Sequence, residues 1–348
     1  MKLSFLALAA SVALSSTIAA TAAFAADITG AGGTFPAPVY NAWGSDFKAK
    51  TGTALNYQAI GSGGGQTQIT NRTVDFGASD APMATDKLTA AKLLQFPTVI
   101  GAIVPIVNIE GVSADQLTLT GAIIADIYQG KITKWNDPKI AELNKDVKLP
   151  DLDIAPVYRA DGSGTTYVFT SYLSAVSPDW KSNIGAATSV QWATGSGAKG
   201  NDGVAGAVKN TQGAIGYVEY VYAANNSLTT TQLQNKDGKV VKPTVPAFQA
   251  AASKADWKGA KDFAVSMIDV GGETSWPIVS TTFILLPKDP KDAKQSAEVM
   301  KFFDWAYKDG AATAEKLHYI PLPKEVIDTV RTAWKSEVKA ADGKAVYE

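Results

Sequence analysis

Apolar runs alternate along the chain with segments in which apolar residues recur at helical spacing. The runs at 55–60 and 154–158 are typical of buried strands. A helix is predicted to begin near Pro36, because proline is favoured in a first helical turn. Its apolar face carries Val39, Trp43 and Phe47. Repeated alternation of strand and helix patterns predicts an α/β fold.

Two longer apolar segments, 96–107 and 277–286, divide the chain into outer and inner parts. We interpret them as crossings between two domains that close like a clamshell. This interpretation predicts a discontinuous domain I (26–104 and 279–348) and an inserted domain II (105–278). In the alternative interpretation both segments are core strands of one larger sheet, and the pattern leaves that alternative open.

The first 25 residues have the pattern of a secretory signal peptide. Lys2 precedes an apolar core from Leu3 to Ala20, and Ala23-Phe24-Ala25 is a small-x-small cleavage site. Cleavage there removes 25 of the 348 residues and one positive charge, which leaves 323 residues with a net charge of −2. We therefore expect a protein exported to the periplasm, long enough to form two domains.

Composition excludes several classes of function. A net charge near zero argues against nucleic acid and anionic membrane surfaces as partners. The chain contains no cysteine, so it has no lipid-modified N-terminal Cys, no thiol nucleophile and no Cys-based metal site. His318 is the only histidine, which argues against a Ser-His-Asp triad or a multi-His zinc site. Its apolar neighbours suggest a packed, structural side chain.

Three loops rich in Gly, Ser and Thr each lie between a predicted strand and a predicted helix; they contain Thr34, Ser62 and Ser163. The free N–H groups and the dipole of a helix N-terminus favour an anion. In open α/β sheets the ligand lies at the carboxyl ends of strands, where these loops fall. Three such loops in one chain therefore suggest convergence on one anion.

The loop from Arg159 to Thr166 combines a guanidinium, two hydroxyl side chains and a helix start, which suits a tetrahedral oxyanion. Asp161 could hold the Arg159 guanidinium in a fixed orientation. The alternative is an ordinary capped helix, in which Ser163 or Thr165 caps the helix and Arg159 pairs with Asp161. A turn-forming role for Asp161 before Gly162 is equally open.

Asp80 follows the predicted strand 74–78, and a carboxylate beside an anion site needs an explanation. An ionised carboxylate only accepts hydrogen bonds, so it would accept a proton from HPO4 or H2PO4 and repel a fully deprotonated sulfate. The alternative is that Asp80 caps a helix that begins near Pro82.

Residues 195–200 satisfy the dinucleotide-binding pattern G-x-G-x-x-G. The strand expected before them at 190–192 is short, and no clear ribose-binding acid completes a βαβ unit. A glycine-rich loop near the cleft is the favoured interpretation. No nucleophile-elbow or P-loop motif occurs.

Several segments together resemble the periplasmic phosphate-binding proteins, the receptors of the high-affinity ABC-type phosphate importer. The similarity covers essentially the whole mature chain. The segments that carry it are 30–40, 74–82, 159–165, 213–220 and 302–308.

The resemblance implies a two-domain periplasmic binding protein clamshell of a type II-like kind, with dehydrated phosphate in the interdomain cleft. It also implies a set of ligand contacts: Thr34, Phe35, Ser62, Asp80, Arg159, Ser163, Gly164 and Thr165. Asp161, paired with Arg159, carries over as a supporting residue. Gly63 is a departure, because some members have a second serine there, and it concerns loop geometry rather than the ligand hydroxyl.

By the same resemblance the protein is a monomer without cofactor, metal or catalytic residue. It would deliver phosphate to a permease and ATPase complex of two membrane subunits and two ATPase subunits, with no insertion of its own into the membrane. Two other classes compete. A secreted phosphatase would use Ser163 or Ser62 as nucleophile but lacks a candidate base. A sulfate or molybdate receptor is opposed by Asp80.

Overall fold

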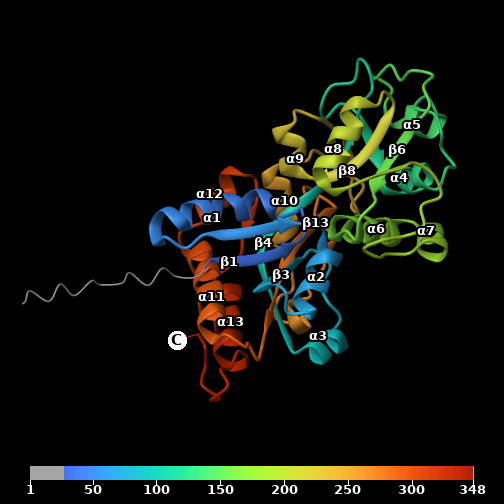
Figure 1. The fold of residues 1–348 in the computed structure, drawn as a ribbon. Coiled ribbons are helices and arrows are strands. Elements are labelled where there is room, and N and C mark those ends of the chain that lie inside the picture. Colours follow the sequence, from blue (N-terminus) through green and yellow to red (C-terminus); the bar gives the residue numbers. More distant parts are fainter. Residues whose placement is uncertain (1–26, 348) are drawn as a thin grey trace, which may run out of the picture.

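The computed structural model describes residues 27–347, and the predicted signal peptide 1–25 lies outside the described residues. The chain forms two lobes joined by a continuous sheet (Figure 1). No helix within residues 27–347 combines the length and apolar character needed to span a bilayer.

Lobe I is a sheet with strand order β2-β1-β3-β13-β4, covered by helices on its two faces (Figure 1). Strands β1, β2 and β3 are parallel, and β13 runs antiparallel to β3 and to β4. Its strands are β1 (Ile28–Gly32), β2 (Leu55–Ala59), β3 (Phe76–Ser79), β4 (Leu93–Val107), β12 (Met267–Ile268), β13 (Ile278–Pro287) and β14 (Ile320–Pro321). Its helices are α1 (Ala37–Thr51), α2 (Ser62–Thr70), α3 (Thr85–Ala91), α11 (Ala293–Lys308), α12 (Ala311–Lys316) and α13 (Lys324–Glu337).

Lobe II continues the sheet through β8, β6 and β7, which are parallel to one another. Its strands are β5 (Thr118–Thr120), β6 (Ala155–Arg159), β7 (Ser196–Ala198), β8 (Ala214–Glu219), β9 (Thr229–Thr230), β10 (Gln232–Gln234) and β11 (Val240–Val241). Its helices are α4 (Gly121–Tyr128), α5 (Pro138–Leu143), α6 (Gly164–Val176), α7 (Pro178–Asn183), α8 (Gly200–Asn210) and α9 (Tyr220–Asn225).

Strand β4 is the crossing between the lobes. Its first part, up to Ala102, pairs with β13 of lobe I, and its last part, from Ile103 to Val107, pairs with β8 of lobe II. All of its residues are buried. The segment predicted as a first crossing is therefore both a crossing and a core strand.

The return of the chain differs from the simple prediction. Strand β13 lies wholly within the lobe I sheet, between β3 and β4. Before it, α10 (Val245–Ala252) and a 3-10 turn (Lys261–Phe263) already contact lobe I. The Gln95 side chain, for example, donates to the carbonyl of Asp262 at 2.8 Å. The chain thus meets lobe I before residue 279, and the proposed domain boundaries stay a prediction.

The glycine-rich segment 61–65 was expected as a loop, but helix α2 begins at Ser62. Its glycines allow a very close approach to the sheet. A Cβ on Gly65 would lie 2.6 Å from the carbonyl oxygen of Ala31 and from the Cα of Gly32. The helix start is therefore held directly against the end of β1.

Aromatic side chains fill both cores. In lobe I the Phe303 ring packs edge-on against Phe76 and Phe96, at centroid distances of 5.1 and 5.8 Å. In lobe II the Phe169 ring stacks on Tyr217 at 4.0 Å. No strand forms at 190–192, where one was expected, and the Trp192 ring stacks on Tyr158 at 5.0 Å instead.

Candidate functional site

The carboxyl ends of two sets of parallel strands face each other where the lobes meet. Strands β1, β2 and β3 end in the loops before α1, α2 and α3, and β6, β7 and β8 end on the opposite side. This arrangement brings together the residues singled out from the sequence, as expected for open α/β sheets. Those residues are Thr34, Phe35, Ser62 and Asp80 from lobe I, and Arg159, Asp161, Ser163, Gly164 and Thr165 from lobe II.

Asp80 forms the acidic wall of the site on lobe I. The side chain is buried, and its backbone N–H donates to the Ser62 hydroxyl at 3.1 Å. The same hydroxyl lies 3.5 Å from Asp80 Oδ2, while Oδ1 is buried with no hydrogen-bond partner among residues 27–347. Asp80 is not a helix cap, because α3 begins at Thr85 and its N-cap residue is Ala84.

The protonation of Asp80 reflects its burial. Loss of water raises the pKa of this carboxyl to about 6, against the lowering effects of the Thr282 hydroxyl, the Arg159 charge and the Ser62 hydroxyl. Above that pH the carboxylate is ionised and can only accept hydrogen bonds.

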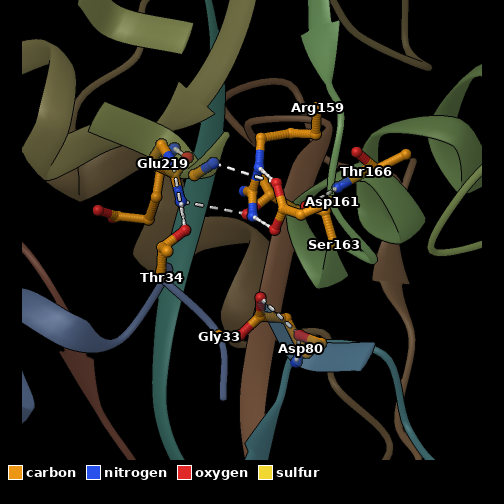
Figure 2. A network of polar contacts seen from close by, with 12 residues as sticks. Gly33, Thr34, Asp80, Arg159, Asp161, Ser163, Thr166 and Glu219 are labelled. Carbon is orange, nitrogen blue, oxygen red and sulfur yellow. Dashed lines mark hydrogen bonds and ion pairs between the residues drawn. The ribbon is translucent and has the colours of Figure 1, made fainter. Parts of the chain in front are cut away.

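Arg159 forms the cationic wall of the site on lobe II (Figure 2). Its Nε donates to Asp161 Oδ1 at 2.8 Å, and its Nη2 donates to Asp161 Oδ2 at 2.5 Å. The third nitrogen, Nη1, is buried without a partner in the described part of the chain. The bidentate pair fixes the plane of the guanidinium and leaves one donor for another group.

Asp161 has a second bond that ties the site together. Its Oδ1 accepts from the backbone N–H of Gly200 at 3.0 Å, at the start of α8. Partial burial favours the neutral carboxyl, but the bonds and charge of Arg159 outweigh it and lower the pKa of Asp161. Two predictions were made for Asp161, that it orients Arg159 and that it forms an ion pair with Arg159. Both describe the same bidentate contact.

Ser163 caps α6, as in the simpler of the two interpretations. Its hydroxyl oxygen accepts from the N–H of Thr166 at 3.0 Å, and its own N–H donates to the Thr188 carbonyl at 2.8 Å. The cap leaves the hydroxyl hydrogen available. The N–H groups of Gly164 and Thr165 lie in the first turn and have no intrahelical acceptor. Helix capping and anion binding are therefore compatible here.

The two walls are in direct contact, so the cleft is closed. The N–H of Gly63 donates across the lobes to the Gly162 carbonyl at 2.9 Å. A Cβ on Gly164 would lie 2.4 Å from Ser62 Oγ and 2.5 Å from Asp80 Oδ2. Only glycine fits at 164 in this closed arrangement.

Three tyrosines, which the sequence analysis missed, hold the loop after β1. The hydroxyls of Tyr57, Tyr222 and Tyr319 donate to the carbonyls of Gly33, Thr34 and Phe35, at 2.7, 2.5 and 2.6 Å respectively. With three successive carbonyls fixed, the N–H groups of this loop are held in a defined orientation. The tyrosines come from distant parts of the chain, so no local signal marks them.

Asn201 was also missed. It is buried at the start of α8, and its amide nitrogen donates to the hydroxyls of Thr34 and Thr165 at 2.7 and 3.3 Å. Its amide oxygen accepts from the backbone N–H of Glu219 at 3.0 Å. The neighbouring segment 195–200 was expected as a glycine-rich loop near the cleft, but it contains strand β7 and ends where α8 begins at Gly200, whose N–H donates to Asp161.

The single histidine lies apart from this cluster. The His318 ring packs edge-on against Tyr220 at a centroid distance of 5.4 Å and adopts a left-handed backbone conformation (φ 64°). Packing of this kind agrees with the structural role expected for it. No group of three or more potential metal-ligating side chains occurs within residues 27–347.

Comparison with known proteins identifies relatives along most of the chain. The family model described as PBP superfamily domain matches residues 16–309. The "Phosphate-binding protein PstS" of Pasteurella multocida is 50% identical over 321 residues, which cover 92% of this chain and 93% of that protein. The protein of the same name from Haemophilus influenzae is 48% identical over 312 residues, covering 90% and 93%.

Solved structures agree on the fold. A phosphate-binding protein from Stenotrophomonas maltophilia superposes with a TM-score of 0.68 at 23% identity, covering 91% of this chain and 96% of that one. At this identity the likeness concerns the fold, which is the α/β two-domain fold of periplasmic phosphate-binding proteins.

Proposed function

The chain belongs to the phosphate-binding proteins of the PBP superfamily, and on that premise we propose that it binds inorganic phosphate for an ABC-type importer. It would act as the substrate-binding component, taking up phosphate in the cleft and delivering it to the membrane permease. The relatives named as phosphate-binding proteins, rather than enzymes, support this role.

One observation carries the proposal: a donor and an acceptor, both buried and both without a partner in the part of the chain that the structure describes, belong to opposite walls of the same cleft. Arg159 Nη1 is the donor and Asp80 Oδ1 is the acceptor. Unpaired buried polar atoms are costly, so a ligand that pairs with both is strongly favoured. A protonated oxyanion, such as HPO4 or H2PO4, has an oxygen for Arg159 and a proton for Asp80.

The remaining donors suit the rest of the ligand. We assign phosphate contacts to the backbone N–H groups of Phe35, Gly164 and Thr165, and to the hydroxyls of Thr34, Ser62, Ser163 and Thr165. Together with Arg159 and Asp80 this inventory allows about a dozen hydrogen bonds to the oxyanion. Asp161 offsets part of the Arg159 charge, so dipoles at the N-termini of α1, α2 and α6 would carry much of the charge stabilisation.

Selectivity would come from Asp80. A sulfate ion has no proton at neutral pH, so one of its lone pairs would face the Asp80 lone pair in a site without water. An unpaired and repelled acceptor costs more than a missing contact, which makes the discrimination large.

Binding would be coupled to closure of the lobes, without covalent chemistry. Phosphate meets an open cleft, and its contacts with both walls shift the population toward the closed form. The closed form then presents both lobes to the permease and its ATPase subunits, an assembly of two membrane and two ATPase subunits on our prediction. We propose a monomeric periplasmic protein, released by cleavage of the predicted signal peptide.

A phosphatase is the weaker candidate. Its possible nucleophiles are already engaged, since Ser62 Oγ accepts from the N–H of Asp80 and Ser163 Oγ caps α6. The one histidine packs on Tyr220 instead of facing either serine. Turnover of a chromogenic phosphate ester that is lost in Ser163→Ala would support this alternative.

Calorimetric titration tests the proposal. Protein freed of bound phosphate is titrated with phosphate, arsenate and sulfate at pH 7. We expect tight binding of phosphate and arsenate, which share the dissociable proton, and no measurable binding of sulfate. Tight sulfate binding would contradict the role of Asp80, and absence of phosphate binding would contradict the function.

A further inference from the structure

Glu219 is a buried carboxyl group that the proposed phosphate contacts do not use. It is the last residue of β8, its side chain has no exposed surface, and it pairs with Ile103 of β4. Ile103 begins the part of β4 that belongs to lobe II. Glu219 therefore lies at the junction of the two lobes.

The two oxygens of Glu219 have different surroundings. Oε2 accepts from the backbone N–H of Val221 at 2.9 Å and lies 3.2 Å from the Tyr319 hydroxyl. Oε1 has no partner among residues 27–347. It lies beside Gly101, where an added Cβ would be 3.2 Å from Oε1 and 2.7 Å from Phe35 Cζ. A charged Oε1 would therefore be buried in the described part of the chain without a hydrogen-bond donor.

A count of hydrogens indicates where the proton lies. The Tyr319 hydroxyl has one hydrogen, and it lies 2.6 Å from the Phe35 carbonyl, which can only accept. The same hydroxyl also lies 3.2 Å from Glu219 Oε2, as a donor to it, and one hydrogen cannot serve both acceptors fully. A proton on Glu219 Oε2 would remove this competition, because Glu219 would then donate to Tyr319 and leave the Tyr319 hydrogen to Phe35.

The charges around Glu219 agree with this arrangement. Strand β4, from 93 to 107, carries no charged residue. Burial and the Asp80 charge raise the pKa of Glu219, whereas the Val221 N–H and the Tyr319 hydroxyl lower it. Burial has the largest effect, so the pKa of Glu219 lies well above its usual value. The cation of the site, Arg159 on β6, has its Nε and Nη2 bound to Asp161. The other titratable neighbours of Glu219 are Tyr220 and Tyr222 on α9, and Asp202 on α8 acts on Tyr222.

We propose that Glu219 is a positioning residue of the phosphate site, which holds a proton in the closed conformation and fixes the Phe35 loop through Tyr319. This inference rests on the proposed phosphate binding. Phe35 belongs to the loop whose N–H groups are assigned to the ligand, and Glu219 is the part of the relay that comes from lobe II.

Ionised Glu219 would disturb the loop. A carboxylate is the stronger acceptor, so it would compete with the Phe35 carbonyl for the single Tyr319 hydrogen. The relay also crosses the lobes, since Tyr319 and Phe35 belong to lobe I. Closure on phosphate therefore requires neutral Glu219, and a proton is taken up wherever the open form is ionised.

Infrared spectroscopy of the phosphate-bound protein at pH 7 gives the direct test. We expect the carbonyl stretch of a protonated carboxyl group in the wild type and its absence in Glu219→Gln. A wild type without a Glu219-dependent band would overturn the proposal. Because this measurement reports on the proton alone, it separates failure of the inference from failure of phosphate binding.

Titration of matched variants tests the positioning role. Glutamine keeps a donor for Tyr319 and cannot ionise, whereas Glu219→Met has similar size and no donor. We expect Glu219→Gln to bind phosphate within about threefold of the wild type at pH 7, and Glu219→Met to bind about tenfold more weakly or worse. Equal weakening in both variants would show that an ionised carboxylate is needed and would overturn the proposal.

The pH dependence of the phosphate dissociation constant distinguishes a proton held on Glu219 from a purely structural role of its side chain. The titrations of phosphate and of Asp80 affect both proteins equally. Their contribution to the pH dependence therefore cancels in the ratio of the wild-type to the Glu219→Gln dissociation constant. We expect this ratio to rise between pH 7 and 9.5, by up to about tenfold per pH unit for one linked proton. A ratio that falls with rising pH would contradict a proton held on Glu219.

Discussion

The two walls of the cleft are built alike but carry opposite chemistry. On lobe I, Asp80 is buried at the end of β3, and on lobe II, Arg159 is buried at the end of β6 (Figure 2). Within residues 27–347 one acceptor oxygen of Asp80 and one donor nitrogen of Arg159 are unpaired. Each wall thus leaves one buried polar atom unpaired, and an unpaired buried polar atom is costly. The two unpaired atoms, one donor and one acceptor, come from different lobes, so a group that pairs with both must contact both lobes.

The same comparison explains why two aspartates in one site behave differently. Burial raises the pKa of Asp80 to about 6, because its donors are hydroxyls and its cation is across the cleft. Asp161 is less buried and is bound at both oxygens by Arg159, so its pKa is lowered. Direct contact with the cation decides the direction of the shift.

Removal of the cationic wall is expected to have the largest effect. Arg159→Met deletes the unpaired donor and leaves Asp161 without its partner, so phosphate binding should weaken by about 2–5 kcal/mol. Calorimetry measures the loss. Arg331→Met is the matched control, because Arg331 pairs with Asp304 outside the cleft and should leave binding unchanged. Retained tight binding in Arg159→Met would contradict the assignment of Arg159 as the cationic contact of the ligand.

The second-largest loss of phosphate affinity is expected from an added side chain between the two walls. In Gly164→Ala the new methyl group meets Ser62 and Asp80 at less than contact distance in the closed form. Binding should weaken by about 1–3 kcal/mol, the usual cost of overpacking, with little loss of stability in the open form. Gly206→Ala serves as control, since an added Cβ at 206 has no neighbour within 4 Å. Equal affinities in both variants would show that closure does not require this contact.

A change in the acidic wall should alter selectivity more than affinity. The amide of Asp80→Asn can donate as well as accept, so it pairs with an unprotonated oxygen. We expect sulfate affinity to rise by about 1–2 kcal/mol while phosphate affinity changes less. Competition titrations measure both. Normal phosphate binding with undiminished rejection of sulfate would remove Asp80 from selectivity.

The tyrosines provide a finer distinction between the lobes. Tyr57 belongs to lobe I and holds the Gly33 carbonyl of the same lobe, whereas Tyr222 of lobe II holds the Thr34 carbonyl across the cleft. Each Tyr→Phe variant should cost about 1 kcal/mol. We expect Tyr57→Phe to lower the unfolding free energy of the ligand-free protein, and Tyr222→Phe to lower phosphate affinity alone. Thermal unfolding with and without phosphate separates the two.

The pH dependence of the ligand-free protein should show two effects with opposite signs. The raised pKa of Asp80 gives stability that is present below its unfolded pKa and is lost as the pH rises through about 6. The lowered pKa of Asp161 gives stability that is present above its unfolded pKa and is lost as the pH falls through its folded value. Denaturant unfolding between pH 3 and 8 measures both contributions to the unfolding free energy. The loss of stability with rising pH should be absent in Asp80→Asn, and the loss with falling pH should be absent in Asp161→Asn.

The elements themselves were largely predictable, and the errors have physical causes. Apolar runs marked β2, β3, β6 and β4, and the helix after Pro36 has the predicted apolar face. Segment 61–65 was expected as a loop because glycine is a poor helix former, yet α2 begins at Ser62, with Gly65 so close to the ends of β1 and β3 that a Cβ would not fit. The segment 277–286 was interpreted as a crossing between domains, but β13 lies between β3 and β4 and is therefore a core strand of lobe I.

The sequence alone determined which chemical groups were available and that their loops follow strand ends: Thr34, Ser62, Asp80 and Arg159 all carry local signals. Only the tertiary structure decided which of their atoms remain unpaired and which distant side chains hold them. Asn201, Tyr319 and Glu219 gave no such signal, because a role at the site that comes from contacts across the lobes leaves no pattern in neighbouring residues. Local sequence encodes strand ends and helix starts, whereas burial and the partners of a buried group arise only when the lobes meet.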